Sequence, residues 1–139
     1  MKVADILKVK GSAVKTVPPH ETALLTSGHL RAAQIGALVV STDGKSINGI
    51  VTERDLRLVE SVSGTEPEKT LVEDAMTPDP YMVPYDTPLR DVIAAMVEHK
   101  YGCAVVMQRG HVAGIFTTID ALRALLAFEK AASRPHYTP

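Results

Sequence analysis

The sequence predicts an α/β (α+β) fold made of two copies of one unit, and three observations lead to this prediction. Residues 49–55, GIVTERD, are matched later in the chain by residues 114–120, GIFTTID. Around each of these segments, helix-like and strand-like stretches follow the order helix, strand, helix, strand, strand, helix. Finally, a unit of about 60 residues is only marginally stable alone, so two copies in a chain of 139 residues are expected to share one core.

The spacing of apolar residues predicts the helices. Each copy opens with a short helical turn, at residues 3–7 and 72–76. Residues 89–97 carry apolar side chains at i, i+3, i+4, i+7 and i+8, which is typical of a helix with one buried face. The counterpart at residues 23–34 contains Gly28 and His29, which cost on the order of 1 kcal/mol in helix propensity, but its leucines still form one face. Residues 54–59 and 120–132 are the closing helices of the two copies.

Continuous apolar runs and turn residues predict the strands. Residues 36–41 and 102–107 lack the polar alternation of a half-exposed strand, so we expect each to be buried on both faces. Short strands at residues 13–17 and 80–84 adjoin prolines. Turn residues at 43–45 and 109–110 precede the strands that end in Thr52 and Thr117.

These elements define the boundaries of the copies. The first repeat is expected at residues 1–62 and the second at residues 71–132. Residues 63–70 are polar and contain Gly64 and Pro67, which is typical of a linker. Residues 133–139 are expected to form a flexible tail.

Composition argues against several classes of function. The chain has 15 basic and 16 acidic residues and a net charge of −1, so it offers no basic surface for nucleic acid or membranes. No apolar run approaches the roughly 20 residues of a membrane span, and the N-terminus lacks the apolar core of a signal peptide. The single cysteine, Cys103, lies in an apolar run and fits a reducing compartment. We therefore expect a cytoplasmic protein.

The two Thr-x-x-Asp segments, Thr52 to Asp55 and Thr117 to Asp120, have two interpretations. Each lies where a strand passes into a helix, and the free N–H groups of such a helix start favour a bound anion such as phosphate. The aspartate three residues after the threonine can accept hydrogen bonds from both hydroxyls of a ribose. The same spacing is also close to a capping box, in which the two side chains satisfy only the donors of the helix.

The ordered series of motifs, present in duplicate, resembles the tandem CBS-domain family, whose pairs are called Bateman modules. The resemblance is carried by the repeat starts at residues 3–7 and 72–78, the middle strands at 35–40 and 101–106, and the two Gly-x-x-Thr-x-x-Asp turns. It covers about residues 1–130 of the chain, in the manner of a stand-alone bacterial-type pair. It implies two repeats packed about a pseudo-two-fold axis, with clefts between them for AMP, ADP, ATP, NAD(H) or S-adenosylmethionine, and a homodimer formed through helices.

The resemblance also implies roles for particular residues. Asp55 and Asp120 would accept the ribose hydroxyls, with Thr52 and Thr117 near the ribose and phosphate. Arg54 would reach a phosphate, whereas its counterpart in the second repeat is Ile119, which departs from that pattern. The adenine would be lined by residues of the strand ends and middle strands: Thr16, Val17, Ile35, Gly36, Ala37, Met82, Val83, Tyr101, Gly102, Cys103 and Ala104.

Three classes of function follow from these patterns. The first is a regulatory module that senses AMP/ATP or NAD(H) and signals to a protein partner. The second is a dimeric scaffold that binds a protein partner without a ligand. The third, an enzyme, has little support, because the sequence has no P-loop or catalytic signature and its five histidines lack the spacing of metal ligands. No catalytic residue, metal or required cofactor is therefore expected.

Overall fold

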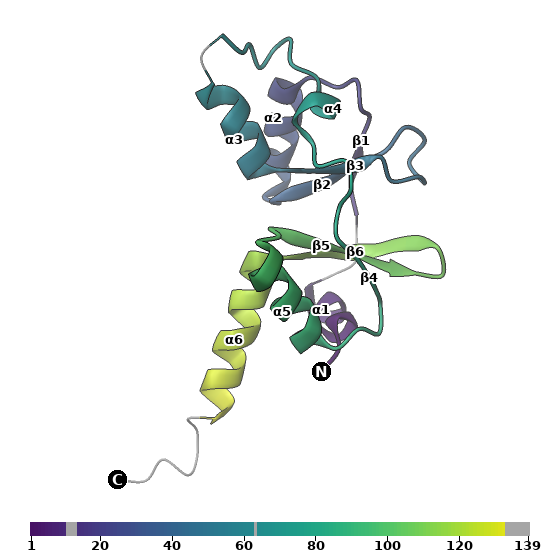
Figure 1. The fold of residues 1–139 in the computed structure, drawn as a ribbon, viewed down its shortest axis with the longest axis vertical. Coiled ribbons are helices and arrows are strands. Elements are labelled where there is room, and N and C mark those ends of the chain that lie inside the picture. The colour runs from purple at the N-terminus through teal and green to yellow at the C-terminus, as the bar shows by residue number, and fades with distance from the viewer. Residues whose placement is uncertain (11–13, 63, 133–139) are drawn as a thin grey trace. The chain divides into compact units, whose positions relative to one another are not determined.

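The structure is a computed structural model that describes residues 1–10, 14–62 and 64–132, and Figure 1 shows its helices and strands. These residues form six helices and two three-stranded sheets, in the order predicted for each repeat. The predicted tail at residues 133–139 lies outside the described residues. The elements are α1 (Val3–Lys10), β1 (Thr16–Val17), α2 (Ala23–Ala33), β2 (Ala37–Val40), β3 (Gly49–Thr52), α3 (Glu53–Ser61), α4 (Val72–Ala75), β4 (Met82–Pro84), α5 (Leu89–His99), β5 (Cys103–Gln108), β6 (His111–Thr117) and α6 (Thr118–Ala132).

The two sheets have the same topology. In the first, β1 pairs in parallel with β2, and β3 pairs antiparallel to β2 on its other side. The second sheet repeats this arrangement with β4, β5 and β6. All four residues of β2 are buried, as the continuous apolar run predicts. The register pairs Ala37 with Thr52 and Cys103 with Thr117, so both threonines end their strands at equivalent places.

Helix α2 forms although Gly28 lies within it. Its N-terminus is capped by Thr22, whose Oγ1 accepts a hydrogen bond from the N–H of Leu25 at 3.2 Å. Leu30 is buried in a cluster with Leu38 of β2. Capping and packing on the sheet therefore compensate for the low helix propensity of the glycine.

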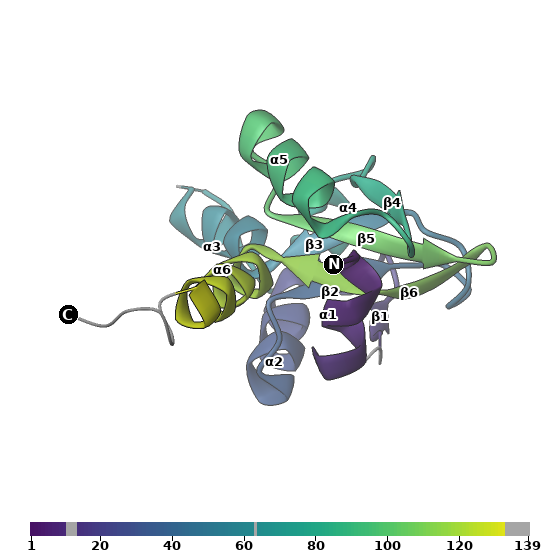
Figure 2. The same ribbon diagram turned by 90° about the horizontal axis from the view of Figure 1, so that it is seen from below.

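The compact units of the structure differ from the order of the repeats along the chain. One unit combines the described parts of Met1–Ser12 and Tyr81–Pro139, and the other comprises those of Ala13–Pro80. We call them the second-repeat unit and the first-repeat unit. Helix α1, which opens the first repeat in the sequence, lies beside β6 in the second-repeat unit, as Figure 2 shows. Helix α4 packs in the first-repeat unit, against α2, α3 and β3.

This exchange was not predicted, because we expected each opening helical turn to belong to the copy that follows it. Val72 of α4 is fully buried in the cluster that contains Val17 and Leu38 of the first repeat. Val3 and Leu7 of α1 are buried against the second repeat. Both helices are short and are stabilised mainly by packing, so each adds to the sheet that covers its apolar side chains. That sheet is not the one formed by the repeat that the helix opens.

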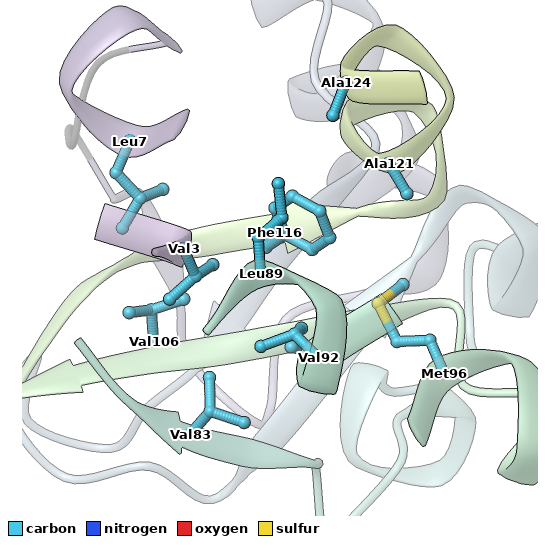
Figure 3. Packing of buried hydrophobic residues seen from close by; sticks show 11 residues of the cluster. Val3, Leu7, Val83, Leu89, Val92, Met96, Val106, Phe116, Ala121 and Ala124 are labelled. Carbon is cyan, nitrogen blue, oxygen red and sulfur yellow. The ribbon is translucent and has the colours of Figure 1, made fainter. Parts of the chain in front are cut away.

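The core of the second-repeat unit centres on Phe116 of β6, the largest fully buried side chain. Figure 3 shows the side chains around it, which come from α1, α5, α6 and the sheet. The buried members of the cluster are Val3, Leu7, Val83, Leu89, Val92, Met96, Ala104, Val106, Phe116, Ala121 and Ala124. The core thus joins the start of the chain to its second half.

The glycine of each Gly-x-x-Thr-x-x-Asp segment lies under an exchanged segment. A Cβ added at Gly49 would lie 2.5 Å from the carbonyl oxygen of Thr77, just after α4. A Cβ added at Gly114 would lie 2.8 Å from Cδ2 of Leu7 in α1. Both glycines therefore permit a close approach of the exchanged segment to the strand.

Candidate functional site

The first Thr-x-x-Asp turn is a capping box at the start of α3. Oγ1 of Thr52 accepts a hydrogen bond from the N–H of Asp55 at 3.2 Å, and Oδ2 of Asp55 accepts one from the N–H of Thr52 at 2.9 Å. The capping interpretation of this segment is therefore confirmed. Asp55 is half-buried, and its hydrogen bonds with other described residues leave Oδ1 unused. A carboxylate oxygen thus remains at this turn to accept a further hydrogen bond.

The second turn has the same two hydrogen bonds between side chain and backbone, and a third between its two side chains. Oδ2 of Asp120 accepts from the N–H of Thr117 at 2.9 Å and from its Oγ1 at 3.0 Å, and the N–H of Asp120 donates to that Oγ1 at 3.3 Å. In addition, Nζ of Lys10 lies 2.6 Å from Oδ2 of Asp120 and 2.6 Å from the carbonyl oxygen of Ile115. Asp120 is only 4% exposed. The two aspartates therefore have different surroundings.

Sequence reasoning missed Lys10. It lies 110 positions before Asp120 and within a helix whose packing partner was not predicted. A lysine at the end of a short amphipathic helix is ordinary, because a basic residue there interacts favourably with the helix dipole. The tertiary structure alone shows the pairing.

The glycine segments before β2 and β5 lie next to the two turns. The N–H of Glu53 donates to the carbonyl oxygen of Gly36 at 2.9 Å, and the N–H of Thr118 donates to that of Gly102 at 3.2 Å. With the register of the strands, these bonds bring Gly36 and Ala37 together with Thr52 and Asp55. Equivalent bonds bring Gly102 and Cys103 together with Thr117 and Asp120. Ile35 is half-buried, while the side chains of Ala37, Cys103 and Ala104 are buried.

The predicted residues of β1 and β4 lie farther along the sheet. Thr16 and Val17 pair with Val39 and Val40, which lie two and three positions beyond Ala37, the residue of β2 that pairs with Thr52. Val17 and Val83 are core residues, whereas Met82 is half-exposed. A pocket of about 280 Å³ is lined by Lys15, Thr16, Val17, Pro18, Glu21, His29, Ala32, Ala33 and Leu38. This pocket lies between β1 and α2, and neither Thr52 nor Asp55 lines it.

The second repeat carries an aromatic stack at positions that are not aromatic in the first. The ring of Tyr101 stacks on Tyr81 at 4.8 Å and on His99 at 5.2 Å. Burial, with the nearby Tyr101 and Asp91, raises the pKa of the Tyr81 hydroxyl. The first repeat has Lys15, Ala33 and Ile35 at these positions. The two repeats therefore differ around the predicted adenine-lining residues as well as at the turns.

Arg54 and Ile119 follow their respective threonines and are both exposed. Within the described segments, the side chain of Arg54 makes no hydrogen bond or ion pair. Its guanidinium is therefore free to pair with an anion near the start of α3. Ile119 offers no such charge at the second turn.

Two further findings concern the described residues only. They contain no group of three or more His, Cys, Asp or Glu side chains that could hold a metal ion. None of their helices combines the length and the apolar character required to cross a membrane.

Comparison with known proteins identifies relatives along most of the chain. The family model of the CBS domain matches residues 3–61 and 72–127. Hypoxic response protein 1 of Mycobacterium tuberculosis is 25% identical over 132 residues, which are 91% of this chain and 92% of that protein. A crystal structure of a CBS-domain containing protein from Agrobacterium tumefaciens has a TM-score of 0.82 at 31% identity, covering 90% of this chain and 99% of the other. The crystal structure of CBSX2 in complex with AMP has a TM-score of 0.67 at 26% identity, covering 84% and 90% of the two chains.

Proposed function

Since the chain belongs to the CBS-domain family, we propose that it is a regulatory module, rather than an enzyme, which binds an adenosine nucleotide and signals its presence to a protein partner. The ligand class comprises AMP, ADP, ATP and NAD(H), with S-adenosylmethionine as a further member. A relative crystallised with AMP supports this class. The first Thr-x-x-Asp turn is the primary site. The observation that carries this assignment is the carboxylate of Asp55, which is half-buried, has Oδ1 unused and pairs with no cation among the described residues, whereas Asp120 is buried and paired with Lys10.

The chemistry of the first turn suits the ribose and phosphate of a nucleotide. Oδ1 of Asp55 can accept a hydrogen bond from a ribose hydroxyl while Oδ2 keeps its bond to the N–H of Thr52. The N-terminus of α3, a helix of nine residues, attracts negative charge. The guanidinium of Arg54 adds a charge-assisted hydrogen-bond donor for phosphate. A ligand with more phosphate charge should therefore bind this turn more tightly than adenosine does.

The proposal is tested by calorimetric titration of the full chain with AMP, NADH and adenosine. We expect AMP and NADH to bind and adenosine to bind more weakly, by roughly 1.5–3 kcal/mol for the lost charge-assisted contact. Absence of heat with AMP and NADH at millimolar concentration would rule out the nucleotide-sensing function and favour the scaffold without a ligand. A turnover assay with NADH, ATP and S-adenosylmethionine tests the non-enzymatic assignment.

We also propose that the protein is a homodimer that uses the outer face of α6. The apolar side chains Ile119, Leu122, Leu125, Leu126 and Phe128 of this helix are all about half exposed or more. Such a row of exposed apolar residues is typical of an association surface. Light scattering at tens of micromolar is expected to give about twice the monomer mass of 14.9 kDa. Leu126→Glu should shift the mass towards the monomer, and a wild-type monomer at that concentration would refute the dimer.

A further inference from the structure

The ammonium group of Lys10 pairs with the carboxylate of Asp120 at the second turn. Nζ of Lys10 lies 2.6 Å from Oδ2 of Asp120, and it also donates to the carbonyl oxygen of Ile115 at 2.6 Å. Every hydrogen bond that the carboxylate of Asp120 accepts from the described residues goes to Oδ2, so Oδ1 is unused, as at Asp55. However, Asp120 is only 4% exposed, whereas Asp55 is half-buried. At the first turn, the carboxylate of Asp55 has no cation within the described residues.

The cause of this difference is the length of the exchanged helices. Helix α1 has eight residues and ends at Lys10, whereas α4 has four residues, Val72–Ala75, and contains no basic side chain. Leu7 packs α1 against β6, because its side chain contacts the strand at Gly114. Lys10 lies about one helical turn beyond this contact. Its ammonium there donates to the carbonyl oxygen of Ile115 and pairs with Asp120. The first-repeat unit lacks this turn and therefore lacks the cation.

We infer that Lys10 makes the two repeats unequal in ligand binding, because its ammonium excludes the ribose of an adenosine nucleotide from Asp120. Each chain then has one ribose site. This inference rests on the function proposed above. Both bonds have an ionised acceptor, but the ammonium also brings a positive charge to the carboxylate, which the neutral hydroxyl of a ribose does not. The ligand would also have to displace the side chain of Lys10 before reaching a carboxylate that is 4% exposed. The first turn imposes neither cost.

Replacement of Lys10 tests this inference in the full chain with AMP as the probe. We expect calorimetry to give one AMP per wild-type chain and two per Lys10→Met chain, with affinity at the second turn raised at least about tenfold. Lys8→Met is the matched control, because Lys8 lies on the same helix and its ammonium pairs with the exposed Asp5, at 4.0 Å, instead of with Asp120. The Lys8→Met chain should still bind one AMP. A wild-type chain that binds two AMP with equal affinity, or a folded Lys10→Met chain that still binds one, would overturn the inference.

A second variant decides the matter if Lys10→Met does not fold, which circular dichroism will show. Asp55→Asn in the wild-type background should leave no site of wild-type affinity, because the second turn is closed. One remaining site of full affinity would instead show that the second turn accepts the ribose in the presence of Lys10. If the proposed nucleotide-binding function is wrong, the wild-type chain will bind no AMP, which distinguishes that outcome from a failure of the inference about Lys10. In that case a first AMP gained by Lys10→Met supports the role of Lys10, and none gained overturns it.

Discussion

Gly49→Ala should lower the free energy of unfolding by about 2–3 kcal/mol, whereas Gly114→Ala should lower it by about 1 kcal/mol or less. The new methyl group at position 49 would meet the carbonyl oxygen of Thr77 at 2.5 Å. That oxygen accepts a hydrogen bond from the N–H of Ile50 at 3.0 Å, and the N–H of Thr77 donates to the carbonyl of Ile50 at 2.8 Å. The backbone at Thr77 cannot move away without breaking this pair of bonds.

The atoms nearest to a methyl group at position 114 all belong to the side chain of Leu7, with Cδ2 at 2.8 Å. A side chain can rotate at lower cost than a hydrogen-bonded backbone can shift, although Leu7 is buried and its rotation disturbs the core. Gly49 and Gly114 occupy equivalent positions in the two copies, but alanine should lower the free energy of unfolding more at position 49 than at position 114.

Chemical denaturation with urea measures both effects. Gly28→Ala is the control, because Gly28 lies within α2 with no atom within 4 Å of an added Cβ. An alanine there should raise the free energy of unfolding by about 0.5–1 kcal/mol, through helix propensity and the lower entropy of the unfolded chain. Equal losses at positions 49 and 114 would contradict the distinction between a backbone clash and a side-chain clash, and a gain at position 49 would contradict the close approach itself.

The element order was predictable because it depends on local patterns. Continuous apolar runs identified the central strands, and the i, i+3, i+4 spacing identified α5. Duplication made each weak signal stronger, since α2 with its internal glycine was supported by the regular pattern of α5. The threonine before α3 was identified as a cap for the same local reason, and the structure confirms it.

The exchange of α1 and α4 could not be predicted from the same patterns. Amphipathic spacing shows that Val3 and Leu7 are buried on one side, but it does not show which sheet covers them. The glycines at positions 49 and 114 carried a signal of close approach, yet the sequence does not name the segment that approaches. The pairing of Lys10 with Asp120 depends entirely on this exchange. The sequence showed that the turns differ at Arg54 and Ile119, but the difference in cation pairing between Asp55 and Asp120 was beyond sequence reasoning.

Asp55→Asn should weaken the binding of AMP by about 10- to 150-fold, or roughly 1.5–3 kcal/mol, while it changes the free energy of unfolding by less than about 1 kcal/mol. The aspartate offers two acceptor oxygens, and the capping box uses Oδ2. Asparagine keeps one carbonyl oxygen, which can replace Oδ2 as the acceptor for the N–H of Thr52. Its second group is then an NH₂ donor, which cannot accept the hydrogen bond of a ribose hydroxyl.

Glu53→Gln is the matched control for the loss of charge. Glu53 lies in the same first turn of α3, and its carboxylate is exposed and pairs with Arg57 at 2.5 Å rather than with the cap. Its replacement removes the same negative charge from the helix start, so it should strengthen or leave unchanged the binding of an anionic nucleotide. If both variants bind AMP as the wild type does, Asp55 is only a cap, because its free oxygen then contributes nothing to the ligand. If Asp55→Asn weakens AMP and adenosine by the same factor, the contact is to the ribose, since the phosphate is absent from adenosine. A loss confined to AMP would instead place the effect at the phosphate and refute the assignment of Asp55 to the ribose.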